Sequence, residues 1–263
     1  MEKKITFKKE NIDYNIIGEG VNIVLIHGFL ESKNMWEDYA ASLAPNFRVI
    51  APDLLGHGNS GNIGYVHTME LMAEAIHAII KHENLKKVVL VGHSMGGYVA
   101  MAFADLYPDM VKGICLFQST TRADSPERKT GRSQAIKLVK TNHKGFIRKA
   151  IPLLFRYSFR IENRHLVNKA KKDGLKTSKQ GVIAALEGMK IRPSREIRLK
   201  FPPYQVYLLG GKFDKLIPRQ TLIEQAAHHP NVRIKILSKA GHMAYLEDKD
   251  AAYRALENWL LYL

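Results

Sequence analysis

Residues 88–100 read VVLVGHSMGGYVA, where an apolar run stops at a glycine-rich turn and a helical pattern begins. The run from Val88 to Val91 is rich in β-branched residues, which is typical of a strand buried on both faces. Three glycines crowd the serine at position 94. Because glycine permits close backbone approach and unusual backbone angles, the pattern predicts a sharp strand–turn–helix with Ser94 at its tip. Such a turn suits a nucleophile or a tightly packed structural serine.

Strand-like and helix-like segments alternate on both sides of this turn. Strands are predicted at 11–17, 21–28, 47–54, 86–92, 111–117, 204–211 and 231–238, and helices at 33–43, 67–82, 98–107, 221–229 and 250–263. This alternation predicts an α/β fold with a mostly parallel, doubly wound sheet and crossover helices on both faces. In such sheets ligands bind at the carboxyl ends of the strands. The polar residues that follow the strands are therefore the candidates for a functional site.

The positive charge of the chain is concentrated in one segment. The net charge is +15, and residues 122–200 alone hold 22 Lys and Arg against six Asp and Glu. We therefore expect residues 1–121 and 201–263 to form two parts of one core, and residues 122–200 to form a basic helical lid inserted over the strand ends. Its apolar residues are expected to face the core or a pocket: Ile136, Leu138, Val139, Phe146, Ile147, Leu153, Leu154 and Phe155.

Composition excludes several classes of protein. The apolar fraction of 46% is that of a globular protein. No apolar run approaches the ~18 residues of a transmembrane helix, and the charged N-terminal segment MEKKITFKKEN resembles no signal peptide. The lone Cys115, in the apolar run GICLF, is expected to be a buried thiol. These features predict a cytoplasmic protein with no transmembrane segment.

Three side chains suited to nucleophilic catalysis follow predicted strands. Ser94 lies in a G-x-S-x-G match between a strand and a helix, which is the context of a nucleophile elbow. A serine hydroxyl needs a base to take its proton, and His242 follows the last predicted strand. The base needs an acid to orient it, and Asp214 follows the strand before that. The sequence therefore predicts a Ser94–His242–Asp214 triad.

These residues belong to five motifs that together resemble the α/β-hydrolase fold superfamily, in its lid-bearing serine hydrolase and esterase branch. The motifs are His27-Gly28-Phe29, residues 53–60 (DLLGHGNS), the elbow, Gly211 to Pro218 and Gly241-His242. The haloalkane dehalogenases and epoxide hydrolases of this superfamily have an aspartate at the nucleophile position, so Ser94 argues against both. Some members place the acid after the strand ending near Phe117, but no carboxylate occurs there before Asp124.

The resemblance also implies an oxyanion hole. The backbone N–H groups of Phe29 and Met95 would bind the oxyanion, and removing one such donor typically costs ~10²–10³ in rate. Supporting roles fall to His27, Gly28, Gly92, His93 and Gly96. The two histidines are expected to hold the oxyanion loop and the elbow by hydrogen bonding.

The expected function is serine hydrolysis of carboxylic esters or thioesters of small to medium size through an acyl-enzyme, with no cofactor and no metal. Two alternatives stay open: the same triad used for C–C bond hydrolysis, perhydrolysis or acyl transfer, and a ligand-binding or receptor-like hydrolase with slow turnover. The basic lid has three interpretations: a solvated surface, a surface that steers anionic substrates or contacts anionic lipid, and a nucleic-acid surface. The last is disfavoured, because no recognition motif is present.

Other polar residues are expected to be structural. Asp53 and the turn at 56–60 suit backbone hydrogen bonding, and Glu247 with Asp248 would cap or lead into the last helix. The role of His57 stays open. The adjacent pair His228-His229 lacks a third ligand nearby, so we predict no metal site there.

Overall fold

The computed structural model describes residues 1–263 and contains an eight-stranded sheet in the order β1-β2-β4-β3-β5-β6-β7-β8. The strands are β1 (Glu2–Phe7), β2 (Glu10–Ile17), β3 (Val21–Ile26), β4 (Phe47–Pro52), β5 (Val88–His93), β6 (Val111–Phe117), β7 (Gln205–Gly211) and β8 (Val232–Leu237). Strand β2 pairs antiparallel with β1 and β4, and all other pairs are parallel. The mostly parallel sheet predicted from the sequence is confirmed. Strand β1 was not predicted.

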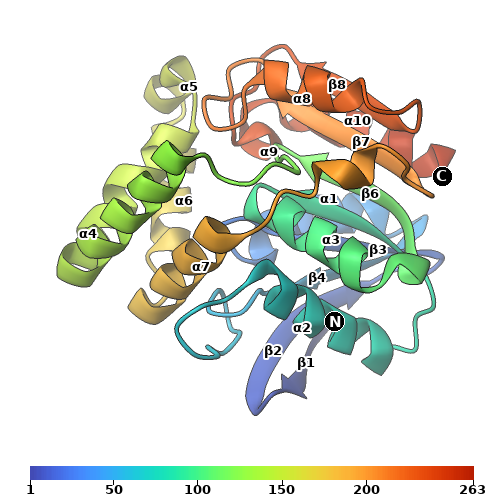
Figure 1. The fold of residues 1–263 in the computed structure, drawn as a ribbon, viewed down its shortest axis with the longest axis horizontal. Coiled ribbons are helices and arrows are strands. Elements are labelled where there is room, and N and C mark those ends of the chain that lie inside the picture. The colour runs from blue at the N-terminus through green and yellow to red at the C-terminus, as the bar shows by residue number, and fades with distance from the viewer.

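Helices cover both faces of the sheet (Figure 1). The core helices are α1 (Glu37–Leu43), α2 (Met69–His82), α3 (Met95–Leu106), α8 (Arg219–Ala226), α9 (Ala244–Glu247) and α10 (Lys249–Tyr262), with 3₁₀ turns η1 (Lys33–Trp36) and η2 (Pro108–Met110). Rings of Tyr39 and Tyr253 lie 5.4 Å apart, which joins α1 to α10. Helix α2 packs beside α3. None of the helices combines the length and the apolar character that a membrane-spanning helix requires.

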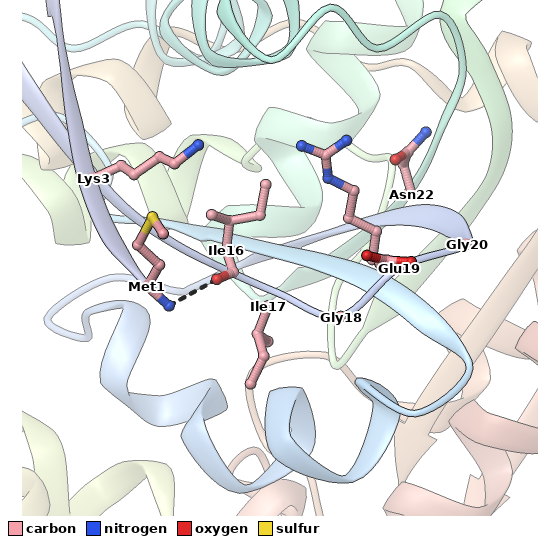
Figure 2. Close-up of a pocket in the computed structure, with 9 residues that line it drawn as sticks. Met1, Lys3, Ile16, Ile17, Gly18, Glu19, Gly20 and Asn22 are labelled. Atoms are coloured by element: carbon pink, nitrogen blue, oxygen red, sulfur yellow. Dashed lines mark hydrogen bonds between the residues drawn. The ribbon is translucent and has the colours of Figure 1, made fainter.

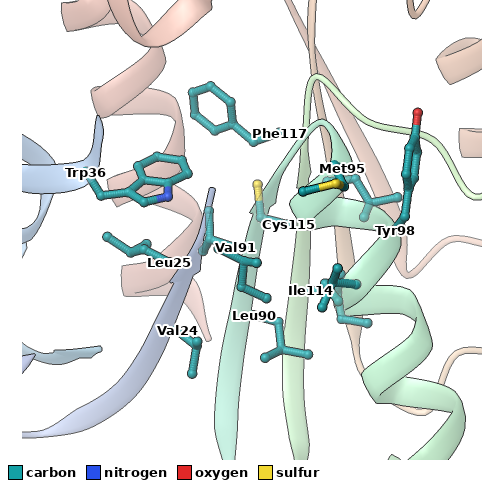
Figure 3. Close-up of a cluster of buried hydrophobic side chains, with 14 of the residues drawn as sticks. Val24, Leu25, Trp36, Leu90, Val91, Met95, Tyr98, Ile114, Cys115 and Phe117 are labelled. Carbon is teal, nitrogen blue, oxygen red and sulfur yellow. The ribbon is translucent and has the colours of Figure 1, made fainter. Parts of the chain in front are cut away.

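Apolar side chains fill the space on both sides of the central strands (Figure 3). Trp36 and Phe117 meet edge to face at 5.6 Å on one side, while Met95 and Tyr98 of α3 lie on the other. Cys115 is fully buried in this cluster, as expected. The residues of β3, β5 and β6 that precede the carboxyl edge of the sheet are almost all inaccessible to solvent. This packing gives the strand ends a rigid base.

The basic helical segment, residues 122–200, leaves the core after β6 and returns to it before β7. It contains α4 (Pro126–Ala150), η3 (Ile151–Leu154), α5 (Tyr157–Glu162), α6 (Arg164–Gly174), α7 (Lys179–Ile191) and η4 (Glu196–Leu199). Figure 1 shows α4 to α7 grouped beside the sheet. Most of its predicted core-facing residues are buried or partly buried. The prediction is wrong for Leu138 and Leu153, which are 58% and 68% exposed because they lie on the solvent side of their helices.

Candidate active site

Ser94 occupies a strained turn between β5 and α3. Its backbone angles are φ 50° and ψ −114°, and its side chain makes no capping bond to the helix behind it. A Cβ at Gly92 would overlap the backbone of Gly96, and a Cβ at Gly96 would overlap the carbonyl oxygen of Ile26. Glycine is therefore required at both positions for the turn to pass this close to the sheet. The turn leaves Ser94 partly exposed.

The three predicted triad side chains meet at the carboxyl edge of the sheet. His242 Nε2 lies 2.9 Å from Ser94 Oγ, and His242 Nδ1 lies 2.8 Å from a carboxylate oxygen of Asp214. Because a carboxylate only accepts hydrogen bonds, Nδ1 carries a proton. In the neutral imidazole Nε2 is then free to accept the proton of the serine hydroxyl.

Asp214 is fixed by backbone donors on its other oxygen. Its Oδ1 accepts hydrogen bonds from the N–H groups of Leu216 (2.8 Å) and Ile217 (2.9 Å). Asp214 and His242 are 6% and 3% exposed. The carboxylate therefore has partners for both oxygens while it is removed from water, which holds it in one orientation.

The β3 loop, residues 27–32, lies against this turn. His27 Nδ1 donates to the carbonyl of Gly28 at 2.7 Å, and His27 Nε2 accepts from the N–H of Leu54 at 2.9 Å. These bonds require a neutral imidazole, and burial lowers the pKa of His27. Within this loop the N–H of Phe29 donates to no protein acceptor. It is available to a bound molecule.

Met95, the residue after the serine, is the first residue of α3. N–H groups in the first turn of a helix have no intrahelical acceptor and carry the positive end of the helix dipole. The N–H groups of Phe29 and Met95 thus come from two segments that lie against the Ser94 turn. The carbonyl of Ser94 is held by Ser119, whose Oγ donates to it at 2.7 Å.

Two buried carboxylates that the sequence analysis did not assign to the site hold its loops. Glu31 accepts from the N–H of Gly28 at 2.7 Å and from His93 Nδ1 at 2.8 Å. Glu247 accepts from the N–H groups of Gly241 (2.7 Å), Met243 (3.2 Å) and Arg156 (2.7 Å). The only signal for Glu31 was a lone acid in the apolar stretch HGFLE.

Glu247 and Asp248 lead into α10, which is one of the two roles predicted for them, but neither caps the helix with a side-chain hydrogen bond. The Glu247 side chain turns back to the loop that carries His242, and Asp248 precedes α10 without a side-chain cap bond. Burial raises the pKa of Glu247 even though three N–H groups oppose the effect. Its bond to Arg156 links the basic helical segment to the histidine loop, residues 238–243.

The remaining polar residues have structural partners. Asp53 accepts from the N–H groups of Lys33 (2.8 Å) and Asn59 (2.9 Å), as expected for a loop residue. His57 contacts the carbonyl of Leu55 and makes no hydrogen bond to the triad, and burial lowers its pKa to about 3.

No group of three or more His, Cys, Asp or Glu side chains is arranged to hold a metal ion. The sequence predicts no metal site at the adjacent pair His228-His229. In the structure His228 contacts Glu196 at 3.2 Å, and His229 accepts from the N–H of Asn231. Both histidines thus have protein partners of their own.

A cavity of about 460 Å³ lies between the β3 loop and the basic helical segment. Phe29, Met243 and Tyr245 line it from the core, and Leu154 and Leu166 line it from the helices. The free backbone N–H described above belongs to Phe29, and Met243 directly follows His242 in the chain. The lining of the cavity therefore includes one predicted oxyanion donor and the residue that follows the predicted base.

A second hollow, of about 490 Å³, lies at the opposite end of the strands (Figure 2). It surrounds the turn from β2 to β3, where the terminal amine of Met1 donates to the carbonyl of Ile16 at 2.9 Å. Its lining contains no Ser, Cys or His and therefore offers no nucleophile–base pair. The nucleophile–base pair of the candidate site lies instead at the carboxyl edge.

A family model described as alpha/beta hydrolase fold matches residues 21–249, a range that contains Ser94, Asp214 and His242. The chain belongs to the alpha/beta hydrolase fold family. A thermophilic esterase from Thermogutta terrifontis, solved with malate bound, is 33% identical, with a TM-score of 0.93 over 100% of this chain and 98% of that one. The family resemblance inferred from the five motifs is confirmed.

Two curated relatives of this hydrolase show different coverage. A putative 2-succinyl-6-hydroxy-2,4-cyclohexadiene-1-carboxylate synthase of Bacillus subtilis is 29% identical over 90% of this chain and 91% of its own. An uncharacterized protein of Mycobacterium tuberculosis is 39% identical over 39% of this chain. That match spans only 30% of the length of the mycobacterial protein.

Proposed function

We propose that this hydrolase is a serine esterase that cleaves carboxylic esters or thioesters of small to medium size through an acyl-enzyme. One observation carries the proposal: Ser94, His242 and Asp214 form an unbroken hydrogen-bonded relay at 2.9 and 2.8 Å. The relay supplies a nucleophile and a base, so the reaction needs no cofactor. The esterase similar over the whole chain supports the same class of reaction.

Acylation begins when His242 Nε2 takes the proton of Ser94 Oγ as the oxygen attacks the substrate carbonyl. The carbonyl oxygen gains negative charge, and the N–H groups of Phe29 and Met95 bind it. The imidazolium that forms is stabilised by Asp214, which stays ionised. His242 then gives its proton to the departing alcohol or thiol, and the acyl group remains on Ser94.

Deacylation repeats these steps with water. His242 takes a proton from water, the oxygen of which attacks the acyl carbonyl, and the same two N–H groups bind the oxyanion. When the tetrahedral intermediate breaks down, His242 returns the proton to Ser94 Oγ and the carboxylic acid leaves. The fixed orientation of Asp214 keeps His242 Nε2 aimed at the serine in both halves of the reaction.

The basic helical segment acts as a lid in this proposal, with residues 1–121 and 201–263 forming the core. The apolar part of the substrate occupies the cavity between the lid and the β3 loop, beside Phe29 and Met243. Lys169, Lys176 and Lys249 also line the cavity, together with Glu31, Glu37, Asp38 and Asp173. Lys176 pairs with Asp173 and Lys249 with Asp38, whereas Lys169 forms no ion pair. A substrate with a carboxylate at its far end could therefore pair with Lys169, and an anionic ester is a variant of the proposal to be tested.

The alternative reactions use the same triad on another bond or acceptor. The Bacillus subtilis relative is named a putative synthase, so a reaction other than ester hydrolysis stays an alternative, with C–C bond hydrolysis, perhydrolysis and acyl transfer as candidates. Product analysis with competing alcohols and with water distinguishes hydrolysis from acyl transfer. A receptor role would give tight binding with negligible turnover over a broad ester and lactone panel.

The proposal is tested with nitrophenyl esters of graded acyl length. We expect Ser94→Ala to lose turnover of every ester that the wild-type protein cleaves. Ser133→Ala, which removes an exposed hydroxyl on α4, is the matched control and should keep full activity. Turnover that survives in Ser94→Ala would assign the nucleophile elsewhere and overturn the proposal.

A further inference from the structure

A buried ion pair behind the triad joins three segments that are far apart in the sequence. His93, the last residue of β5, contacts Glu31 of the β3 loop at 2.8 Å through Nδ1. Its Nε2 contacts the carbonyl oxygen of His242 at 3.0 Å. Glu31 is also held by Gly28 N–H at 2.7 Å and by the hydroxyl of Tyr245 at 3.2 Å. The His93 and Glu31 side chains are 1% and 7% exposed.

The partners of His93 determine its protonation state. A carboxylate oxygen and a carbonyl oxygen both only accept hydrogen bonds. Both ring nitrogens must therefore carry a proton, and His93 is an imidazolium. Burial opposes this charge, but the charge and the hydrogen bond of Glu31 outweigh it and raise the pKa of His93. Burial likewise opposes the Glu31 carboxylate, while His93 and the Gly28 N–H keep its pKa below the ordinary value.

We propose that His93 is a positioning residue whose fixed imidazolium holds the β3 loop and the histidine loop at one spacing. One N–H fixes Glu31, and through it Gly28, next to the Phe29 N–H that binds the oxyanion. The other N–H fixes the backbone of His242, the base. The inference rests on the proposed function, because it explains how the oxyanion donor and the base face the same carbonyl.

The local packing agrees with this role. A Cβ at Gly28 would come within 2.9 Å of His93 Nδ1 and 2.6 Å of Glu31, so glycine is required where the ion pair meets the loop. The rings of His93 and His242 lie 5.3 Å apart. Glu31 offsets the positive charge of His93 at this distance, so that the base can still accept a proton.

Two amide substitutions separate the two hydrogen bonds of His93. The side-chain nitrogen of Gln stands near the position of Nε2, and that of Asn stands near Nδ1. His93→Gln therefore keeps the bond to the His242 carbonyl and loses the partner of Glu31. His93→Asn keeps the bond to Glu31 and releases the histidine loop. His228→Gln is the matched control, because His228 also contacts a glutamate and lies outside both loops.

We expect both His93 variants to lose kcat by about 10- to 100-fold, with KM within about two-fold of wild type, because small misplacements of reacting groups have this effect. The control should change neither constant. If both variants keep wild-type kcat, the positioning role is wrong, whereas the proposed function is judged separately by Ser94→Ala.

The protonation state of His93 can also be measured in the wild-type protein, so the proposal remains testable if a variant fails to fold. Heteronuclear NMR of isotopically labelled histidine should show one buried imidazole with both ring nitrogens protonated at neutral pH. Its contacts to Tyr245 and His242, whose rings lie 5.5 and 5.3 Å away, assign it to His93. A neutral His93 ring would overturn the proposal even if the variants lose activity.

Discussion

At the carboxyl edge of the sheet charged side chains are buried and paired, whereas in the basic helical segment most of them are exposed. Asp214, His242 and His93 are 6%, 3% and 1% exposed, and each has a polar partner on both sides. Helices α4 and α6 instead carry lysines and arginines on open surface. The difference indicates that the triad is held in a fixed geometry at the edge, while the helices of the segment leave most of their charges in solvent.

The two regions meet in a buried anchor at the base of the segment. Arg192, 3% exposed, contacts Asp124 at 2.9 Å, and its guanidinium lies 3.8 Å from the ring centre of Tyr98 on α3. The N–H of Arg195 donates to the carbonyl of Thr121 at 2.7 Å, which ties the outgoing and returning chains together. The segment is therefore rigid where it joins the core.

The largest expected effect concerns the acid of the triad. Asp214→Asn keeps the shape of the side chain but removes the charge that holds the Nδ1 proton of His242. We expect kcat to fall by about 10³- to 10⁴-fold. Asp109→Asn, which changes an exposed acid of η2 outside the cavity, should leave kcat within about two-fold. Steady-state kinetics of the two variants measure the contrast, and equal losses would contradict it.

The anchor should matter for stability more than any exposed ion pair. Arg192→Leu leaves the buried Asp124 with only Arg132, and we expect a loss of about 3 kcal/mol in unfolding free energy. Lys176→Ala breaks an exposed pair and should cost less than about 1 kcal/mol. Urea titrations compare the two. A loss at Arg192 no larger than that at Lys176 would show that the anchor does not hold the segment.

The anchor also predicts a pH dependence. Burial alone would raise the pKa of Asp124, but Arg132 and Arg192 hold it below the ordinary value of 3.8. The ionised form is thus favoured by folding, so its contribution is present above the ordinary value and is lost as the pH falls below it. The stability difference between wild type and Arg192→Leu should shrink over that acidic range. A difference that grows on acidification would reverse the assigned sign.

Substitutions of two glycines compare the close packing at the Ser94 turn with the open surface of α4. Gly96→Ala would overlap the backbone of β3, and we expect a loss of about 1–3 kcal/mol together with reduced activity. Gly131→Ala on α4 meets nothing within 4 Å and should stabilise the protein by about 0.5–1 kcal/mol, because alanine favours a helix. Thermal unfolding of both variants measures the change in stability. We expect a decrease for Gly96→Ala and an increase for Gly131→Ala.

The smallest expected effect concerns the lysines of the cavity. If they attract the free end of an anionic ester, added salt should raise its KM by a few-fold and leave a neutral ester of equal size unchanged. Lys169→Gln should reduce the difference. Equal salt dependence for the two esters would leave the basic helical segment as a solvated surface.

The fold and the triad could be predicted because they depend on local patterns. Apolar runs followed by Ser94, Asp214 and His242 place three reactive groups at strand ends, and a parallel sheet brings those ends together. Glu31 and Glu247 could not be assigned, because their partners His93 and Arg156 are 62 and 91 residues away. Strand β1 was missed because charged residues interrupt its alternation.

Site mapping of a fluorophosphonate adduct tests the central claim most directly. The probe reacts with a serine that an adjacent base has activated, and mass spectrometry of digested protein identifies the modified residue. We expect one adduct per chain, on Ser94, which is absent in Ser94→Ala and forms much more slowly in Asp214→Asn. Efficient labelling at another residue, or ester turnover that continues after Ser94 is fully modified, would contradict it.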